Sequence, residues 1–249
     1  MQRTRLTQLA AGTVLALAMT GVLAQEHLVI KRPFNLPPSA DLVYKIAARK
    51  KGISLGGDAL VIWRVGEGVY SAANTARASF LGKILDNRTE GAIDAFGLAP
   101  TRFHEKRFRK DATTATFDRA AHTITFNDGK LSYPLLGGEQ DRGSAQWQLA
   151  ALARAAPDKF VPGSEWKFFV AGRRDAEEWT FKVIGRESLI TGMGSMPVLH
   201  FVRLPTPGGN TQHIDLWLAP AHEWYPVKLR IAEEDGEFVQ QTIDQITRK

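Results

Sequence analysis

Short extended segments separated by turn residues make up most of this chain, and this pattern restricts its fold more than any other feature. Turns such as Asn127-Asp128-Gly129 contain residues that tolerate the positive φ angles of tight antiparallel connections. About twelve to fourteen strands are expected, and an open sheet of that size tends to curl or split. The expected strands are 41–50, 57–65, 68–78, 84–95, 100–109, 112–118, 121–127, 164–171, 177–184, 186–191, 196–204, 211–219, 224–233 and 237–246.

A single helix is expected among these strands. Residues 145–156 are rich in helix formers, Asp141-Arg-Gly-Ser144 can cap their start, and Pro157 ends them. Crossover helices are missing, which excludes a parallel α/β architecture. The segment 59–65 is apolar on both faces and should need cover on both sides. We therefore predict a mainly β (α+β) fold, in which one main helix covers a large, strongly curved antiparallel sheet or half-barrel.

The first 24 residues are typical of a cleavable signal peptide. Arg3 and Arg5 precede an apolar stretch that ends in the small-residue site Val22-Leu23-Ala24. This stretch is too short for the roughly 20 apolar residues of a membrane span. The chain contains no cysteine, which excludes a lipid-anchored lipoprotein, disulfides and thiol chemistry. We expect a protein of the periplasm with no membrane-spanning segment after cleavage.

The rest of the chain divides into an irregular lead-in, 25–40, and a single β-rich domain, 41–249. The net charge of the whole chain is +6, and a mild positive charge favours solubility and attraction to anionic surfaces such as lipid headgroups. Nucleic acid is not an expected partner of an exported protein.

Searches for catalytic motifs find little. His104-Glu105 and His222-Glu223 both lack the second histidine that a zinc-protease helix places four residues later. No nucleophile elbow, phosphate loop or dinucleotide fingerprint is present. His213 and Asp215 would share one face of a strand, which is two thirds of a metal or acid–base site. We expect no enzyme activity, cofactor or metal; a hydrolase of an envelope polymer that uses His213 and Asp215 is an alternative.

Aromatic and apolar side chains are more numerous than one helix can cover, so some of them are candidates for lining a ligand site. The segment Thr101–Lys110 carries five basic residues, which suit phosphate or carboxylate headgroups; the alternative is a solvated strand protected from aggregation. The candidate lining residues are Leu60, Ile62, Trp63, Trp147, Trp179, Phe181 and Trp217, with Arg102, Lys106 and Arg109 as headgroup contacts.

Several turn and strand motifs resemble those of a bacterial exported family, domain of unknown function 3108. These are Gly91–Phe103, Ala115–Asp118, the helix that follows Asp141, Ile214–Ala219 and Pro226–Arg230. The resemblance covers about residues 40–245. It implies a fold like that of the lipoprotein-carrier (Lol) superfamily, in which helices cover the open side of a curved half-barrel around an apolar cavity. It implies no activity and no catalytic residue.

These observations favour a periplasmic protein that binds or carries an apolar or amphipathic, lipid-like envelope ligand. An envelope interaction or assembly protein without a small ligand is the second hypothesis. The volume enclosed by the sheet distinguishes the two hypotheses. A ligand site needs an apolar void of roughly several hundred Å³, whereas tight packing favours the second hypothesis.

Overall fold

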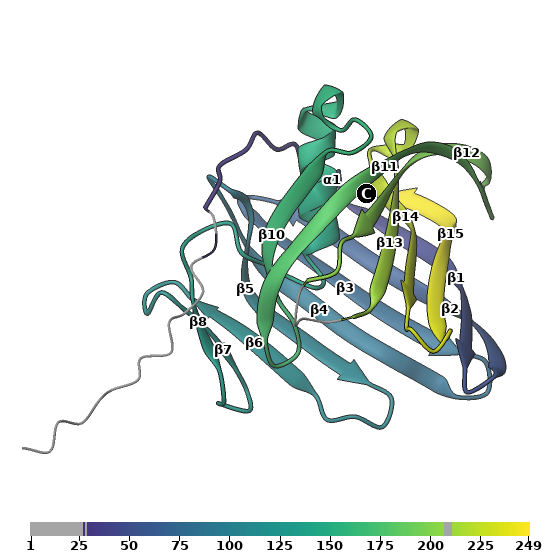
Figure 1. Ribbon diagram of the computed structural model, residues 1–249, viewed down its shortest axis with the longest axis horizontal. Coiled ribbons are helices and arrows are strands. Elements are labelled where there is room, and N and C mark those ends of the chain that lie inside the picture. Colours follow the sequence, from purple (N-terminus) through teal and green to yellow (C-terminus); the bar gives the residue numbers. More distant parts are fainter. Residues whose placement is uncertain (1–26, 28, 207–210) are drawn as a thin grey trace, which may run out of the picture.

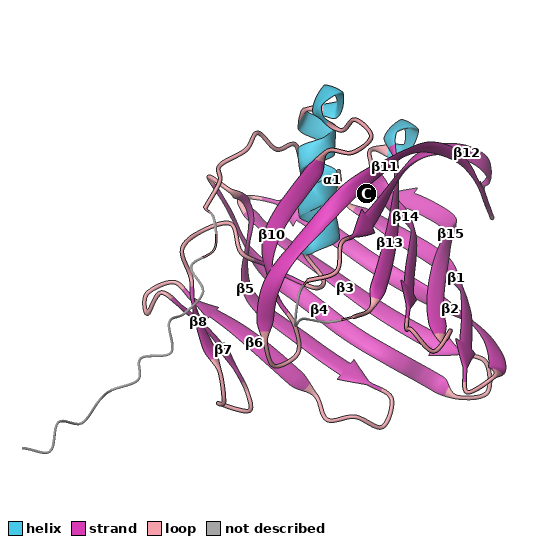
Figure 2. Ribbon diagram, viewed as in Figure 1, coloured by secondary structure: helices cyan, strands magenta, loops and turns pink. Residues whose placement is uncertain are grey.

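A computed structural model describes residues 27, 29–206 and 211–249, so the predicted signal peptide lies outside the described residues. In these residues 15 strands form one sheet, which curls around a single α-helix (Figures 1 and 2). The strands are β1 (Ala40–Lys50), β2 (Ile53–Gly66), β3 (Val69–Ala78), β4 (Gly82–Asp94), β5 (Gly97–Arg107), β6 (Thr113–Asp118), β7 (Thr123–Phe126), β8 (Ser132–Pro134), β9 (Gln140–Asp141), β10 (Glu165–Ala171), β11 (Ala176–Thr191), β12 (Gly194–Arg203), β13 (His213–Ala219), β14 (Tyr225–Ala232) and β15 (Phe238–Arg248).

The sheet is rolled so that its two edges approach each other. Its order is β8-β7-β6-β5-β4-β3-β2-β1-β15-β14-β13-β12-β11-β10-β9, and every pair is antiparallel except β9 with β10. Residues 135–139 connect the two edge strands, β8 and β9. A link of that length spans at most about 20 Å, far less than the width of a flat sheet of this size.

The rolled ends overlap, and β10 is packed between two layers. Phe168 and Val170 on one face of β10 belong to the apolar cluster around the helix. Phe169 and Ala171 on the other face pack with Phe103 and the aromatic residues of β6 and β7. The overlap therefore buries both faces of this strand.

The helix α1 (Ala145–Ala155) lies inside the curl (Figure 2). Asp141 fixes its start, because Oδ1 accepts hydrogen bonds from the backbone N–H groups of Gly143, at 2.7 Å, and Ser144, at 2.9 Å. The ring of Trp147 stacks on that of Trp63 in β2, with centroids 4.2 Å apart and planes 5° from parallel. Residues on all sides of the helix are buried, from Trp147 to Ala153. The helix thus fills this part of the interior.

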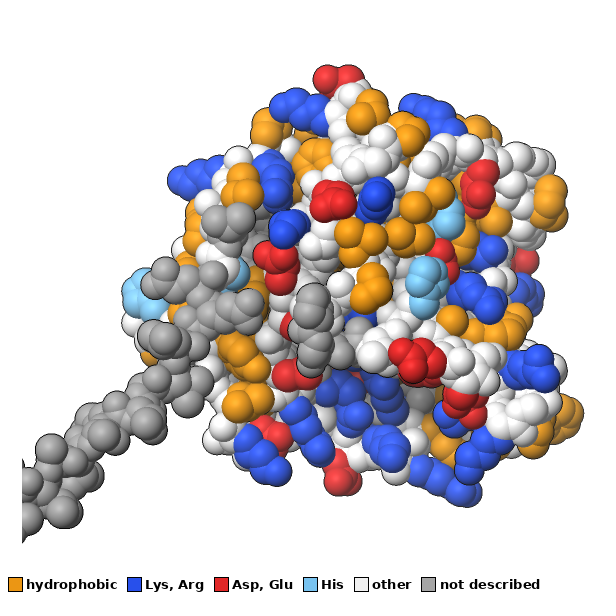
Figure 3. All heavy atoms as spheres, in the orientation of Figure 1, with side chains coloured by type: hydrophobic (Ala, Val, Ile, Leu, Met, Phe, Trp, Pro, Cys, Tyr) orange, Lys and Arg blue, Asp and Glu red, His pale blue; other side chains and the backbone are white. Residues whose placement is uncertain are grey.

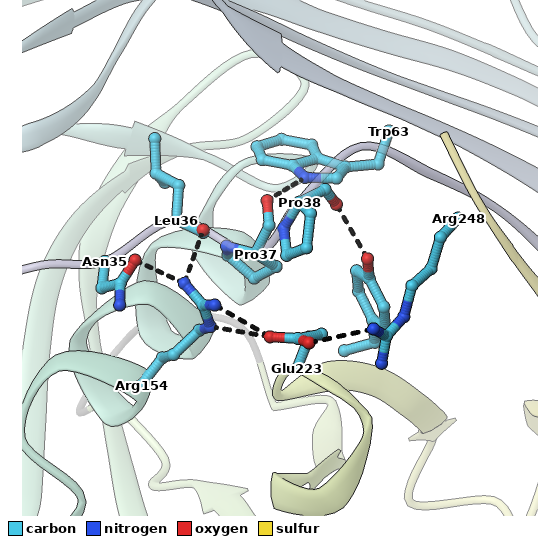
Figure 4. A network of polar contacts seen from close by, with 9 residues as sticks. Asn35, Leu36, Pro37, Pro38, Trp63, Arg154, Glu223 and Arg248 are labelled. Atoms are coloured by element: carbon cyan, nitrogen blue, oxygen red, sulfur yellow. Dashed lines mark hydrogen bonds and ion pairs between the residues drawn. The ribbon is translucent and has the colours of Figure 1, made fainter.

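The lead-in crosses the end of the curl next to the C-terminus of α1 (Figure 4). The Arg154 guanidinium donates hydrogen bonds to the Asn35 side chain and, at 3.1 Å, to the Leu36 carbonyl. It also forms an ion pair with Glu223, at 2.8 Å. Trp63 Nε1 donates to the Pro37 carbonyl at 2.9 Å. These contacts attach the lead-in to the helix, to β2 and to the turn before β14.

We expect Arg154→Met to lower the free energy of unfolding by about 1–3 kcal/mol, because it removes charged hydrogen bonds from a half-buried network while keeping the aliphatic stem. Urea denaturation measures this change. Lys159→Met, at an exposed site of the same region, is the matched control and should change stability by less than about 0.5 kcal/mol. Equal stability of the two variants would contradict the structural role of the network.

The predicted fold class is confirmed: a curled antiparallel sheet with one main helix. The expected strands 177–184 and 186–191 are one strand, β11, whose pairing with β12 shifts register between Val183 and Gly185. The expected helix ends one residue earlier, at Ala155. The short edge strands β8 and β9 were not predicted, because three and two residues show no periodicity. Residues 29–39 form no helix or strand.

Candidate ligand-binding face

Alternation along the strands divides the side chains between an inner face, toward α1, and an outer face. Around the helix the inner face is tightly packed. A cavity of about 20 Å³ lies there, beneath the lead-in and between Gln148, Leu152 and Phe168. That volume suits about one water molecule. This cavity is far too small for a lipid-sized ligand.

The inner face continues beyond the helix, where it is less covered. Strands β1 to β4 extend well past the N-terminal end of α1 (Figure 1). Cross-strand pairing places Ile214, Ile231 and Val239 in one row of this face. Ile214 is buried, Ile231 is half-buried and Val239 is 49% exposed. The row continues across β1 and β2 through the half-buried Ala48 and Leu55. An apolar strip of the inner face is thus accessible.

Two arginines contact an aromatic ring at the other end of this row. Arg203 pairs across strands with Ile214 and with Phe181, and its guanidinium carbon lies 5.0 Å from the Trp179 ring centroid. The guanidinium carbon of Arg142 lies 5.8 Å from the same centroid. Such cation–π contacts hold a guanidinium in a fixed plane.

The electrostatics of the two arginines differ. Arg203 is only 1% exposed; it forms an ion pair with Glu177 at 3.2 Å and donates to the Gln212 carbonyl at 2.7 Å. Arg142 Nε is buried, and it has no hydrogen-bond partner among the described residues. Burial lowers the pKa of both guanidinium groups, although arginine stays protonated at neutral pH. Arg142 therefore offers an unpaired N–H donor at Nε, and the carboxylates of Glu105, Asp175 and Glu177 also interact with its charge.

A further ion-pair cluster joins the overlapping ends of the sheet nearby. The carboxylate of Glu105 is buried and lies 2.7 Å from Arg107 Nε and 3.3 Å from Arg173 Nε. Arg173 belongs to the turn between β10 and β11, whereas Glu105 belongs to β5. These ion pairs hold the overlapping ends of the sheet together close to Arg142 and Arg203.

The residues predicted from the sequence lie in three separate places. Trp63 and Trp147 are stacked in the packed core, while Trp179 and Phe181 lie on the inner face next to Arg203. Leu60 and Ile62 lie on the outer face of β2, because they alternate with the inward-facing Trp63. Leu60 is 41% exposed, so the outer face of this strand is not covered as expected. Trp217 stacks on His200 and belongs to the same buried cluster as Trp63 and Trp147. Arg102 and Lys106 are on the exposed outer face of β5, and Arg109 lies in the turn after it.

Seven residues named for this face were not predicted: Ala48, Leu55, Arg142, Arg203, Ile214, Ile231 and Val239. The alternation of Val227, Leu229 and Ile231 indicated which side of β14 faces inward. A charged residue in a strand or turn normally indicates solvent, so the two arginines carried no signal for the interior.

His213 and Asp215 do share one face, as predicted. The Asp215 carboxylate contacts His200 Nε2 at 2.8 Å and His213 Nε2 at 3.2 Å. Burial alone would raise the pKa of Asp215, but the two histidines together hold it below its ordinary value. Within the described ranges, no second carboxylate is hydrogen-bonded to His213 or Asp215 and no group of three side chains has metal-binding geometry. The cluster consists of one carboxylate between two imidazoles.

The fold and this face define a class: rolled, half-barrel-like β proteins with an internal helix. The chain belongs to the family described as protein of unknown function DUF3108, whose model matches residues 43–244. The family predicted from the sequence is therefore confirmed.

Solved structures of similar fold include a β-barrel-like protein of domain of unknown function DUF1849 from Brucella abortus, with 11% identity, a TM-score of 0.56, and coverage of 87% of this chain and 99% of that chain. The chain also aligns with a putative outer membrane lipoprotein-sorting protein domain from Vibrio parahaemolyticus, with 9% identity, a TM-score of 0.28, and coverage of 85% of this chain and 86% of that chain. No curated protein matches. Among the described residues, no helix is long and apolar enough to cross a membrane.

Proposed function

We propose that this chain is a periplasmic binding protein that holds an amphipathic, lipid-like ligand with an anionic head on the open part of the inner face. The observation that carries the proposal is Arg142 Nε, a buried N–H donor without a hydrogen-bond partner among the described residues, in a guanidinium that lies over the Trp179 ring. Guanidinium groups bind carboxylates and phosphates through paired hydrogen bonds. The half-buried Ile231 and the exposed Val239 would contact the apolar part of the ligand.

The direct test is to purify the protein from bacterial membranes and periplasm without detergent and to analyse extracted lipids by mass spectrometry. Binding of a fluorescent anionic fatty acid and of its neutral methyl ester is then compared in solution. The proposal expects tighter binding of the acid. An absence of co-purified lipid together with equal or undetectable binding of acid and ester would overturn it.

We expect Arg142→Gln to weaken binding of the fatty acid about 10- to 100-fold, since a hydrogen bond to a charged group contributes about 1.5–3 kcal/mol. Arg102→Gln is the matched control, because Arg102 is exposed on the outer face of β5 and should leave the affinity unchanged. Loss of affinity in the Arg102 variant alone would instead place the headgroup on the outer basic segment.

The second candidate is an envelope interaction or assembly protein without a small ligand. The packing around α1 favours it, because the cavity there has a volume of only about 20 Å³. The lipid analysis separates the two functions: this candidate expects no lipid in the purified protein and no saturable binding of the fluorescent fatty acid.

A further inference from the structure

Three turns form a row at one end of the sheet. Strands β1 to β6 are consecutive and antiparallel, so the β1–β2, β3–β4 and β5–β6 turns all emerge at the same end. Neighbouring turns in this row are two strands apart, or roughly 10 Å. The backbone N–H of Phe108 donates to the Ile84 carbonyl at 2.9 Å and so ties the third turn to the second. We call residues 49–53, 79–83 and 107–111 the turn row.

Exposed apolar side chains project from every turn of this row. Phe80 is fully exposed, and its φ of 69° lies in the left-handed region that favours glycine or asparagine. The fold thus gives no reason for phenylalanine at this position. Ile53, in the first turn, is 62% exposed, and Phe108, in the third, is 39% exposed. Large apolar groups at adjacent loop tips are typical of an interaction surface.

The same turns are strongly basic. They contain seven lysines or arginines and one acidic residue, Asp111. Lys and Arg side chains gather along the lower edge of the molecule in Figure 3, where the ends of these strands lie in Figure 1. Lys50 is paired with Glu237 and Lys83 with Asp86. Arg109 and Lys110 are exposed and form no ion pair among the described residues, whereas the exposed Lys51 lies beside Glu237, whose carboxylate accepts a hydrogen bond from the Lys51 backbone N–H at 2.8 Å. The Arg109 guanidinium carbon lies 5.0 Å from the Phe108 ring centroid.

We propose that the turn row is a docking surface for an anionic phospholipid membrane. Basic side chains near an anionic bilayer are attracted by its surface potential, and aromatic side chains insert at the level of the headgroups. A row of loop tips can meet a flat surface simultaneously, whereas the rolled walls of the sheet cannot. Membrane docking does not depend on the ligand proposed for the inner face.

Vesicle sedimentation tests the docking surface. We expect the purified protein to bind vesicles that contain phosphatidylglycerol more tightly than vesicles of phosphatidylcholine, with an affinity that falls as salt is raised. The triple variant Lys51→Gln, Arg109→Gln, Lys110→Gln should bind the anionic vesicles on the order of 100-fold more weakly. Phe80→Asn should weaken binding about 10-fold and leave the fold intact, since asparagine suits the left-handed turn.

Matched controls separate this surface from general charge. The triple variant Lys159→Gln, Lys182→Gln, Arg186→Gln removes the same charge elsewhere, and Ile190→Asn removes another exposed apolar side chain. Both should bind vesicles like the wild-type protein. Equal binding to both vesicle types, or equal losses in control and turn-row variants, would overturn the proposal. So would full binding by the Phe80 variant together with tight binding of dextran sulfate, which would indicate a soluble polyanion. Arg142→Gln should leave vesicle binding unchanged, so the two proposals can fail separately.

Discussion

Trp147→Ala is expected to lower the free energy of unfolding by about 3–5 kcal/mol, the usual cost of removing a fully buried tryptophan from a packed core. The indole ring fills the space between α1 and β2, where it stacks on Trp63 and meets Tyr225 edge-on at 6.4 Å. Without it, both the helix and the sheet lose their central contact. Chemical denaturation followed by far-ultraviolet circular dichroism measures the change.

Leu60→Ala is the control for this prediction. Leu60 lies on the same strand as Trp63 but points outward and is 41% exposed, so its truncation should cost less than about 1 kcal/mol. A loss below about 1 kcal/mol in the Trp147 variant would show that the helix is not anchored by this stack.

The second expected result concerns pH. Burial raises the pKa of Asp141 to about 6, against the hydrogen bonds from Thr89, Ser144 and Gly143, which lower it. In the unfolded chain the pKa would be about 3.9. The folded state therefore binds this proton more tightly, and the stabilisation is fully present below about pH 4. It is lost as pH rises through about 6, and amounts to about 3 kcal/mol, at 1.36 kcal/mol per pKa unit.

Asp141→Asn isolates this effect from the other titrating groups. The amide oxygen can still accept from the Gly143 and Ser144 N–H groups, and its NH₂ can donate to the Thr89 hydroxyl. We expect the variant to gain on the wild-type protein as pH rises from 4 to 7, by up to about 3 kcal/mol in relative stability. Urea unfolding at each pH measures the difference. Parallel stability curves for the two proteins would show that Asp141 has an ordinary pKa.

Strand patterning was sufficient to predict the architecture, because turn residues and alternation are local signals. Alternation also shows why Phe181 and Trp179 face inward. It failed for Leu60 and Ile62, since a strand that is apolar on both faces does not indicate which face is inside. The packed interior was beyond prediction for a different reason. Whether Trp147 lines a cavity or fills one depends on how far the helix enters the roll, which no local pattern encodes.

The candidate ligand face was harder to predict than the fold. Arg142 and Arg203 are far apart in the chain, and they meet at Trp179 only because β9 joins the far edge of the sheet beside β10. The turn row is a contrasting case. Its basic residues can be recognised in the sequence. That they lie at the same end of the sheet follows only from the pairing of β1 to β6.

The pairing of β1 with β15 has a consequence for the connectivity of the chain. Both terminal strands lie at the centre of the sheet, and the Lys249 backbone N–H donates to the Ser39 carbonyl at 2.9 Å. If these two points were joined, the strands from β10 through β15 and β1 to β8 would follow one another as an antiparallel meander, whereas β9 pairs parallel with β10. A circularly permuted chain, with these two points joined and new termini within residues 135–139, would therefore keep every strand pair. In the natural order, β1 and β15 are the first and last strands in the chain, so this central pair can form only after β15 has been synthesised.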